Sequence, residues 1–309
     1  MATFGILLKS YGPDLPYAAR FMASYSQYVQ GDVPVHAVVP DEDVAAFTAM
    51  MAGRGEVLPE SLWSEHLVNH PIHGNSPGYI NQEIIKLAFY QQGLLENYLC
   101  ADSEAVFLRP FSETDFMSDK TTPYTFVTSD AELRVDPSYW QRYGEARDRS
   151  LIALRAYLEL EPVQPFETCH GFGVLSATVV RSLRMFLDDR NMSYADALQL
   201  CPYEFSWYNF WLEKSKVIPR LTREPIFHTV HIESQHLEMA LKEIDPDTLS
   251  RGYVGVVVNS GFSRASGIVD VAEPRTQTLG RYVPLSQLAR ATWERGLRKV
   301  PRVRKVLGL

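Results

Sequence analysis

Tyr98-Leu-Cys-Ala-Asp-Ser-Glu-Ala-Val-Phe-Leu-Arg-Pro110 is the stretch of this chain that decides its fold. It predicts a short apolar strand, a turn with two acids one residue apart, and a second apolar strand ended by proline. Side chains alternate across extended backbone, so Asp102 and Glu104 are expected to face one side with Ser103 turned away. Mg²⁺ usually takes one or two carboxylates plus substrate phosphates. The alternative is a solvated acidic turn, but the apolar flanks favour a ligand site.

The residues before this stretch alternate between strand and helix patterns. Strands are predicted at 3–8 and 35–39, and each is followed by a helical pattern, which is typical of a parallel α/β fold. Ligands of such folds bind beyond the carboxyl ends of the strands. We therefore expect the loop from Ser10 through Tyr11 to Asp14 to hold the base and ribose of a nucleotide. An ordinary Gly-Pro turn is an equally good interpretation of this loop.

Two further segments carry candidate ligand contacts. A helix is predicted at 82–92, where Lys86 can reach a phosphate and Gln82 can hydrogen-bond a sugar or ribose; a surface lysine is the alternative. Gly171 and Gly173 flank an aromatic residue before a predicted strand. Glycines at such positions let backbone approach a ligand closely.

Glu204 is a single carboxylate in the aromatic segment 202–212, most of which we expect to be core. If Glu204 is buried it needs partners, and burial is expected to raise its pKa. Such a group is a candidate for proton abstraction or for binding a sugar hydroxyl. Aromatic faces beside carboxylates also suit a sugar ring.

The histidines fall into two groups. His228 and His231 lie three apart in a predicted strand and should point to opposite faces, so they do not easily bind one metal together. A hydrogen-bonded structural histidine is the alternative for either. The histidines of segment 59–77 suggest a metal face, but Pro71 lies inside the run, and we favour a solvated loop over a zinc site.

Three segments carry a resemblance to a known family. Residues 98–110 resemble the Asp-x-Asp region of nucleotide-sugar glycosyltransferases with the GT-A fold. The Gly-Tyr-Ile-Asn-Gln-Glu-Ile-Ile-Lys-Leu segment at 78–87 resembles a Gly-Trp/Tyr-x-x-Gln-x-x-x-Lys-Leu helix of a bacterial branch of these enzymes. The Glu-Phe-Ser-Trp-Tyr segment at 204–208 resembles that branch's Glu-Tyr-x-x-Tyr segment. One departure is clear, because Glu104 stands where the family has its second aspartate.

The resemblance implies a GT-A-like single domain with a mostly parallel, Rossmann-like central sheet and an aromatic-rich insertion at 112–165. It implies transfer of a sugar from a nucleotide-diphosphate donor to a glycan or lipid-linked acceptor, in cell-envelope polysaccharide or glycolipid synthesis. Asp102 and Glu104 would hold Mn²⁺ or Mg²⁺, with His228 completing the site, and Asp102 and Glu204 would be catalytic. Gly171 and Gly173 would line the donor-sugar pocket.

Two other functions stay open at this point. A sugar nucleotidyltransferase would use a similar fold and metal, although the glycine-rich phosphate loop expected near its N-terminus is missing. A catalytically inactive glycan-binding or scaffold protein is the non-enzyme alternative, and Glu104 keeps it open.

Composition bounds the class of protein. The chain has 309 residues, of which 46% are hydrophobic, enough for one large core without disulfides. Its three cysteines lie far apart without metal-type spacing, and no secretory segment is apparent at the N-terminus. These features predict reduced thiols in a cytoplasmic protein.

Charge separates the last residues from the rest. Residues 290–309 hold seven basic residues and one acid, a charge of +6, whereas the whole chain carries −7, so the remainder carries −13. We therefore expect a domain over 1–285 and a basic amphipathic tail over 286–309. Trp293 and Leu297 make an anionic membrane surface its best partner, ahead of nucleic acid or a helix capping the acidic body. The acidic body argues against nucleic-acid binding, and the tail can hold the protein at the inner face of the cytoplasmic membrane.

Overall fold

The computed structural model describes residues 2–129, 131–134, 139–162, 171–231, 235, 239, 242 and 244–259. The strands are β1 (Ala2–Lys9), β2 (Val35–Val39), β3 (Glu56–Pro59), β4 (Leu95–Asp102), β5 (Ala105–Phe107), β6 (Tyr124–Phe126), β7 (Phe172–Ser176), β8 (Leu221–Arg223), β9 (Phe227–Val230) and β10 (Gly255–Val258). The α-helices are α1 (Leu15–Tyr28), α2 (Val44–Met51), α3 (Pro77–Ala88), α4 (Ala131–Arg134), α6 (Glu145–Tyr157), α7 (Ala177–Asp188), α8 (Tyr194–Leu200), α9 (Glu204–Ser215) and α11 (Pro246–Ser250). A π-helical segment, Trp140–Gly144, leads into α6.

The central sheet has the order β3-β2-β1-β4-β7. Strand β1 runs parallel to both β2 and β4, and β2 runs parallel to β3, whereas β7 is antiparallel to β4. The predicted α/β class with a mostly parallel sheet is therefore confirmed, and the arrangement is consistent with a GT-A-like fold. The strands predicted at 3–8 and 35–39 are β1 and β2.

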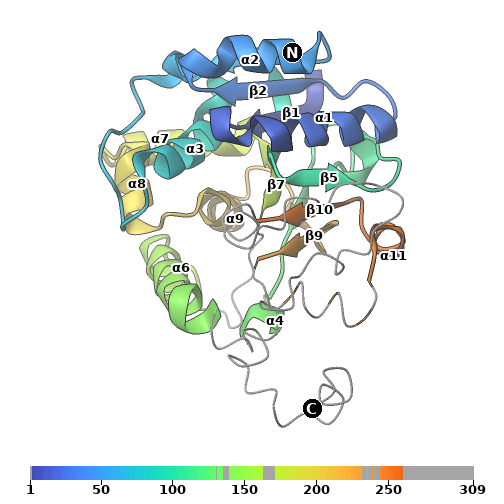
Figure 1. Cartoon of the computed structure of the whole chain (residues 1–309). Coiled ribbons are helices and arrows are strands. Elements are labelled where there is room, and N and C mark those ends of the chain that lie inside the picture. Colours follow the sequence, from blue (N-terminus) through green and yellow to red (C-terminus); the bar gives the residue numbers. More distant parts are fainter. Residues whose placement is uncertain are drawn as a thin grey trace, which may run out of the picture.

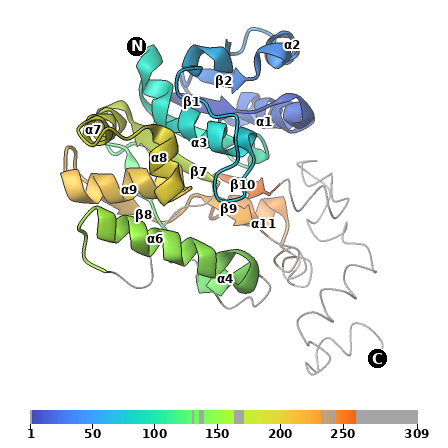
Figure 2. The same ribbon diagram turned by 90° about the vertical axis from the view of Figure 1, so that its left-hand side faces the viewer.

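Helices cover both faces of this sheet because the strands are apolar on both sides. Leu7 and Cys100 face a core formed with α3, α6, α7, α8 and α9. Ile6 and Leu99 face the opposite core, formed with α1 and α2. Figure 1 and Figure 2 show α1 and α2 on one side of the sheet and α3, α7 and α8 on the other. The central sheet is therefore held between two layers of helices.

Two smaller sheets complete the described fold. One has the order β5-β10-β9 and the other pairs β6 with β8. Strands β4 and β5 are separated only by Ser103 and Glu104, yet they belong to different sheets. The acidic turn therefore joins the central sheet to its neighbour.

Helix α3 departs from the predicted bounds of 82–92. It begins at Pro77, with Ser76 as N-cap, because the Ser76 hydroxyl accepts a hydrogen bond from the Tyr79 amide at 3.3 Å and proline suits the first helical turn. It ends at Ala88 and continues as a 3₁₀ turn to Gln92. The Ser-Pro signal was assigned to the preceding loop, so the predicted start came five residues too late.

The described residues leave part of the predictions untested. The basic tail at 286–309 lies outside them, as does Cys169, and the boundary at 285 stays a prediction. The helix expected near the end of the 112–165 insertion is α6.

Candidate functional site

The carboxyl ends of β1 and β4 lie side by side at the point where the strand order reverses. Strands β2 and β3 extend the sheet on one side of β1, and β4 follows on the other. Lys9 and Asp102 are register partners at these ends. Ligands of open parallel sheets bind at such a reversal. Asp102 therefore stands at the position where this fold offers a binding crevice.

The turn after β4 places Ser103 inward. The Ser103 hydroxyl donates to the Ser10 hydroxyl at 2.7 Å, and both side chains are buried. The contact ties the turn to the loop after β1, and the prediction that Ser103 turns away from a ligand stays a prediction. The side chain of Asp102 is 26% exposed, and Glu104 is half-buried.

A buried ion cluster lies beside Asp102. The Lys86 ammonium is 2.8 Å from a Glu204 oxygen and 3.6 Å from an Asp102 oxygen. Lys86 and Glu204 are 3% and 5% exposed, so Asp102 is the cluster's more open member. Gln82 is also near, with its amide nitrogen 3.5 Å from Asp102. The structure thus brings together four of the residues proposed from the sequence.

The prediction for the pKa of Glu204 is wrong in direction. Burial raises the pKa, as expected, but the adjacent Lys86 ammonium and hydrogen bonds to the carboxylate outweigh burial, and the pKa is lowered. The Lys86 pKa is raised well above its usual value, because the neighbouring acids, Glu204 first, overcome the effect of burial. Lys86 and Glu204 therefore form a charged pair in the folded protein.

Glu83 is the member of the cluster that the sequence analysis did not identify. It lies on α3 one turn before Lys86, 2% exposed, with its Oε2 atom 3.6 Å from the Lys86 nitrogen. Burial first, and then the Glu204 carboxylate, raises its pKa well above the usual value. The signal was a glutamate on the same helical face as the apolar residues Ile80 and Ile84.

An aromatic ring lies beside the cluster. The Lys86 nitrogen lies 5.1 Å from the centre of the Phe205 ring. A Cβ atom on Gly173 would stand 2.7 Å from that ring, so only glycine leaves room for it. Gly171 has a φ of +76°, in the left-handed region that favours glycine. Gly173 therefore leaves room for the Phe205 ring. A role for either glycine beside a donor sugar stays a prediction.

The loop after β1 exposes one of the three residues proposed to contact a nucleotide. Tyr11 is 39% exposed, whereas Ser10 and Asp14 are buried at 3% and 7%. The Gly12 amide donates to an Asp43 oxygen at 2.6 Å, which fixes the loop to the segment before α2. Tyr11 is therefore the member of this loop best exposed to a nucleotide, and the contacts proposed for all three stay predictions.

The predicted metal ligands Asp102, Glu104 and His228 come from different parts of the fold. In the part of the chain that the structure describes, no three or more His, Cys, Asp and Glu side chains are grouped to hold a metal ion. His228 lies in β9, and β10 separates it from β5, the strand that follows Glu104. Asp102 and Glu104 still fit the chemistry of Mg²⁺ with a bound diphosphate, which needs only one or two carboxylates. The role of His228 stays a prediction.

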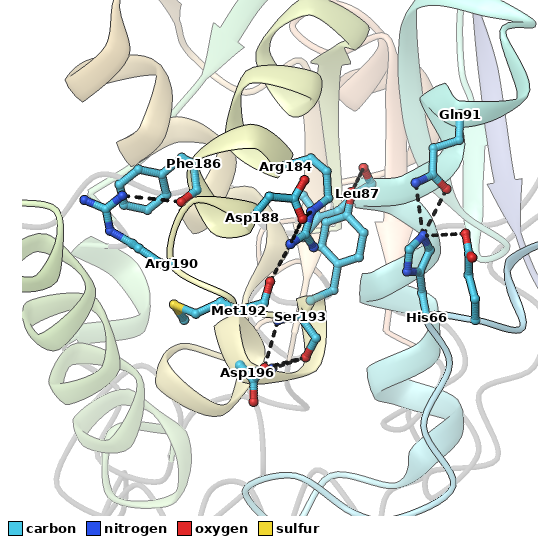
Figure 3. A network of polar contacts seen from close by, with 12 residues as sticks. His66, Leu87, Gln91, Arg184, Phe186, Asp188, Arg190, Met192, Ser193 and Asp196 are labelled. Carbon is cyan, nitrogen blue, oxygen red and sulfur yellow. Dashed lines mark hydrogen bonds and ion pairs between the residues drawn. The ribbon is translucent and has the colours of Figure 1, made fainter.

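A second set of polar contacts involves α7, α8 and the segments that carry His66 and Gln91 (Figure 3). Figure 3 shows His66 beside Gln91, with the ring nitrogen 3.2 Å from the amide oxygen, and the guanidinium of Arg184 2.7 Å from Asp188. His66 also lies 3.4 Å from the Glu65 carboxylate. These contacts give His66 protein partners, in keeping with the non-zinc interpretation of its segment.

Three comparisons relate the chain to known proteins. No protein-family model matches the chain, and no curated protein matches it in sequence. Among solved structures, mouse xyloside xylosyltransferase 1 in its apo form aligns with a TM-score of 0.48 at 10% identity, over 84% of this chain and 98% of that chain. Among the described residues, no helix is long and apolar enough to cross a membrane.

Proposed function

We propose that this protein is a metal-dependent glycosyltransferase that moves a sugar from a nucleotide-diphosphate sugar to a glycan or lipid-linked acceptor. One observation carries the proposal: Asp102 stands at the strand-order reversal, partly open, with the Lys86 ammonium 3.6 Å away. A carboxylate and an ammonium side by side can address the metal and the phosphates of one metal–diphosphate group.

The roles of the residues follow from their surroundings. Asp102 and Glu104 hold Mn²⁺ or Mg²⁺, and the metal supplies charge neutralisation of the leaving diphosphate when bound. Lys86 has three N–H donors, of which Glu204 takes one at 2.8 Å, so it can also steady a phosphate oxygen. Gln82 contacts the sugar or ribose, and Tyr11 packs on the nucleotide.

Glu204 contributes through Lys86 in this proposal. The sequence suggested a direct sugar or acceptor contact, but the side chain is 5% exposed and its carboxylate is paired with Lys86. Catalysis then consists mainly of positioning and electrostatic stabilisation of the leaving group.

A donor screen tests the proposal. A thermal-shift panel of nucleotide diphosphates, with and without Mn²⁺, should show one nucleotide that raises the melting temperature only when metal is present. Nucleotide-sugar hydrolysis with Mn²⁺ would then support transfer. Pyrophosphate release would indicate a nucleotidyltransferase, and glycan binding without turnover would indicate a binding protein; either result contradicts the proposal.

The basic tail supports an acceptor at a membrane. Its +6 charge, interleaved with Trp293 and Leu297, predicts attachment to anionic lipid that weakens with salt, because screening shortens to about 8 Å at physiological ionic strength. The full chain should sediment with anionic liposomes at low salt, and a chain truncated after Ser286 should not. If the full chain ignores the liposomes, a dissolved acceptor becomes the better assignment.

A further inference from the structure

Two acids and one base share a buried space between α3 and α9. Glu83 and Glu204 are 2% and 5% exposed, and Lys86 between them is 3% exposed. With every group ionised, Lys86 would face both of these carboxylates and the partly open Asp102, so at least one buried negative charge would be left without a counter-ion. An uncompensated buried charge is strongly unfavourable, and a buried carboxyl group avoids the cost by keeping its proton.

The surroundings of the two acids decide which of them keeps the proton. Glu204 is the first residue of the twelve-residue helix α9, where the helix dipole favours a negative charge, and it lies 2.8 Å from the Lys86 ammonium. Glu83 lies inside α3, where no helix terminus favours its charge, and it is 3.6 Å from the same ammonium. Glu204 is therefore the stabilised anion and Glu83 the acid that stays neutral.

Hydrogen bonding points the same way. A hydrogen bond between Glu83 and Glu204 is among the causes that raise the pKa of Glu83 and lower that of Glu204, and such a bond requires one of the two carboxyl groups to be protonated. The Glu83 Oε2 atom is buried without a hydrogen-bond partner among the described residues. An oxygen left unpaired costs less in a neutral carboxyl group than in a carboxylate.

We infer that Glu83 is a positioning residue, a neutral carboxylic acid that donates a hydrogen bond to Glu204 and so fixes that carboxylate against Lys86. The fixed pair leaves the other two N–H groups of Lys86 for Asp102, whose carboxylate oxygen is 3.6 Å away, and for a bound phosphate. The catalytic consequence rests on the proposed function, whereas the protonation of Glu83 is a property of the folded chain alone.

Infrared spectroscopy of the full chain at neutral pH tests the protonation. The wild-type protein should show the carbonyl band of a buried protonated carboxyl group, and Glu83→Gln should lose it. Glu204→Gln should lose it too, because Glu83 then ionises as the counter-ion of Lys86. Glu65→Gln, whose carboxylate is 77% exposed, is the matched control and should keep the band. A wild-type protein without the band, or a band that survives in Glu83→Gln, overturns the inference.

A comparison of Glu83→Gln, which keeps the shape of the side chain, with Glu83→Ala tests the positioning role. Glutamine is neutral, has the same shape and can donate to Glu204, so Glu83→Gln should keep kcat and KM within about twofold of wild type. Glu83→Ala and Glu204→Gln should each lower kcat at least about tenfold, with little change in KM. A Glu83→Gln protein that fails to fold, or loses as much turnover as Glu83→Ala, contradicts the role. If no transferase activity exists at all, the infrared result still stands or falls by itself.

Discussion

Helix α9 carries an ion-pair network at each end, and the two are built differently. At its start, Glu204 meets Lys86, both nearly inaccessible, with a second buried acid beside them. At its end, Glu213 accepts two hydrogen bonds from Arg155 at 2.9 and 3.1 Å, and its side chain is 27% exposed. Arg155 also donates to a backbone carbonyl and lies over the Phe210 ring.

The difference distinguishes a pair whose geometry favours stability from a pair that we propose serves a ligand. Arg155 uses its planar fork in a bidentate contact and directs its other donors to a carbonyl, which is a geometry that favours stability. The network at the start contains an excess acid, because Glu83 is buried beside a Lys86 that already pairs with Glu204. Proteins tolerate such imbalance mainly at sites that serve a ligand.

The largest expected effect is a loss of activity when Asp102, the open member of the cluster at the start of α9, is replaced. Asp102→Ala should lower turnover at least about 100-fold and remove metal-dependent nucleotide binding, because the partly open carboxylate is the proposed metal ligand. The melting temperature should change little. Steady-state kinetics and the thermal-shift panel measure both. Unchanged turnover would mean that the cluster at the start of α9 has no role in catalysis. Glu104→Asp should stay active if Glu104 is a metal ligand.

The next effect is on stability. Lys86→Met removes the counter-ion of a buried carboxylate and should lower the free energy of unfolding by about 3–5 kcal/mol. Urea unfolding at neutral pH measures the change. A midpoint equal to that of wild type would mean that the buried pair contributes nothing to the fold.

A smaller loss is expected at the far end of α9. Glu213→Gln leaves the guanidinium of Arg155 short of its carboxylate and should lower the free energy of unfolding by about 1–3 kcal/mol. Turnover of the folded protein should equal that of wild type. Glu159→Gln is the matched control, because Glu159 pairs with Lys214 at 3.1 Å while 84% exposed and should change neither property. A loss of turnover in Glu213→Gln would erase the distinction between the two networks.

The smallest effect concerns pH. The Glu83 pKa is raised in the folded state, so above the usual glutamate pKa of about 4.3 the folded chain holds a proton that the unfolded chain has lost. Stability therefore falls as pH rises through this window, by up to about 1.4 kcal/mol per pH unit. Glu83→Gln lacks this decline, so its stability relative to wild type should grow from about pH 5 to pH 7 in urea unfolding. A stability difference between the two chains that stays constant over this pH range would contradict the raised pKa.

The architecture could be predicted from local patterns. Strands β1 and β2 have continuous apolar runs, and the acids at 41–43 mark the helix that follows. Asp102 could be placed at a strand end because apolar strands flank the turn on both sides. The start of α3 was missed because its proline was interpreted as a loop residue.

The contacts of the site could not be predicted in the same way. Lys86 and Glu204 are 118 residues apart, and nothing in either segment states that the helices carrying them meet. Burial alone would raise the pKa of Glu204, but the ion pair with Lys86 lowers it. The pairing of β5 with β10, about 150 positions later in the chain, is likewise set by tertiary packing.

The two-residue turn after β4 has a mechanical consequence. Asp102 ends a strand of the central sheet, whereas Glu104 leads into β5 of the neighbouring sheet, so the spacing of the two carboxylates depends on how the two sheets are placed. Any rotation of one sheet against the other would change the spacing of the two carboxylates. A ligand that binds Asp102 and Glu104 together would select one arrangement of the two sheets. By thermodynamic linkage, a contact that shifts β9 or β10 would change the affinity of the turn for that ligand.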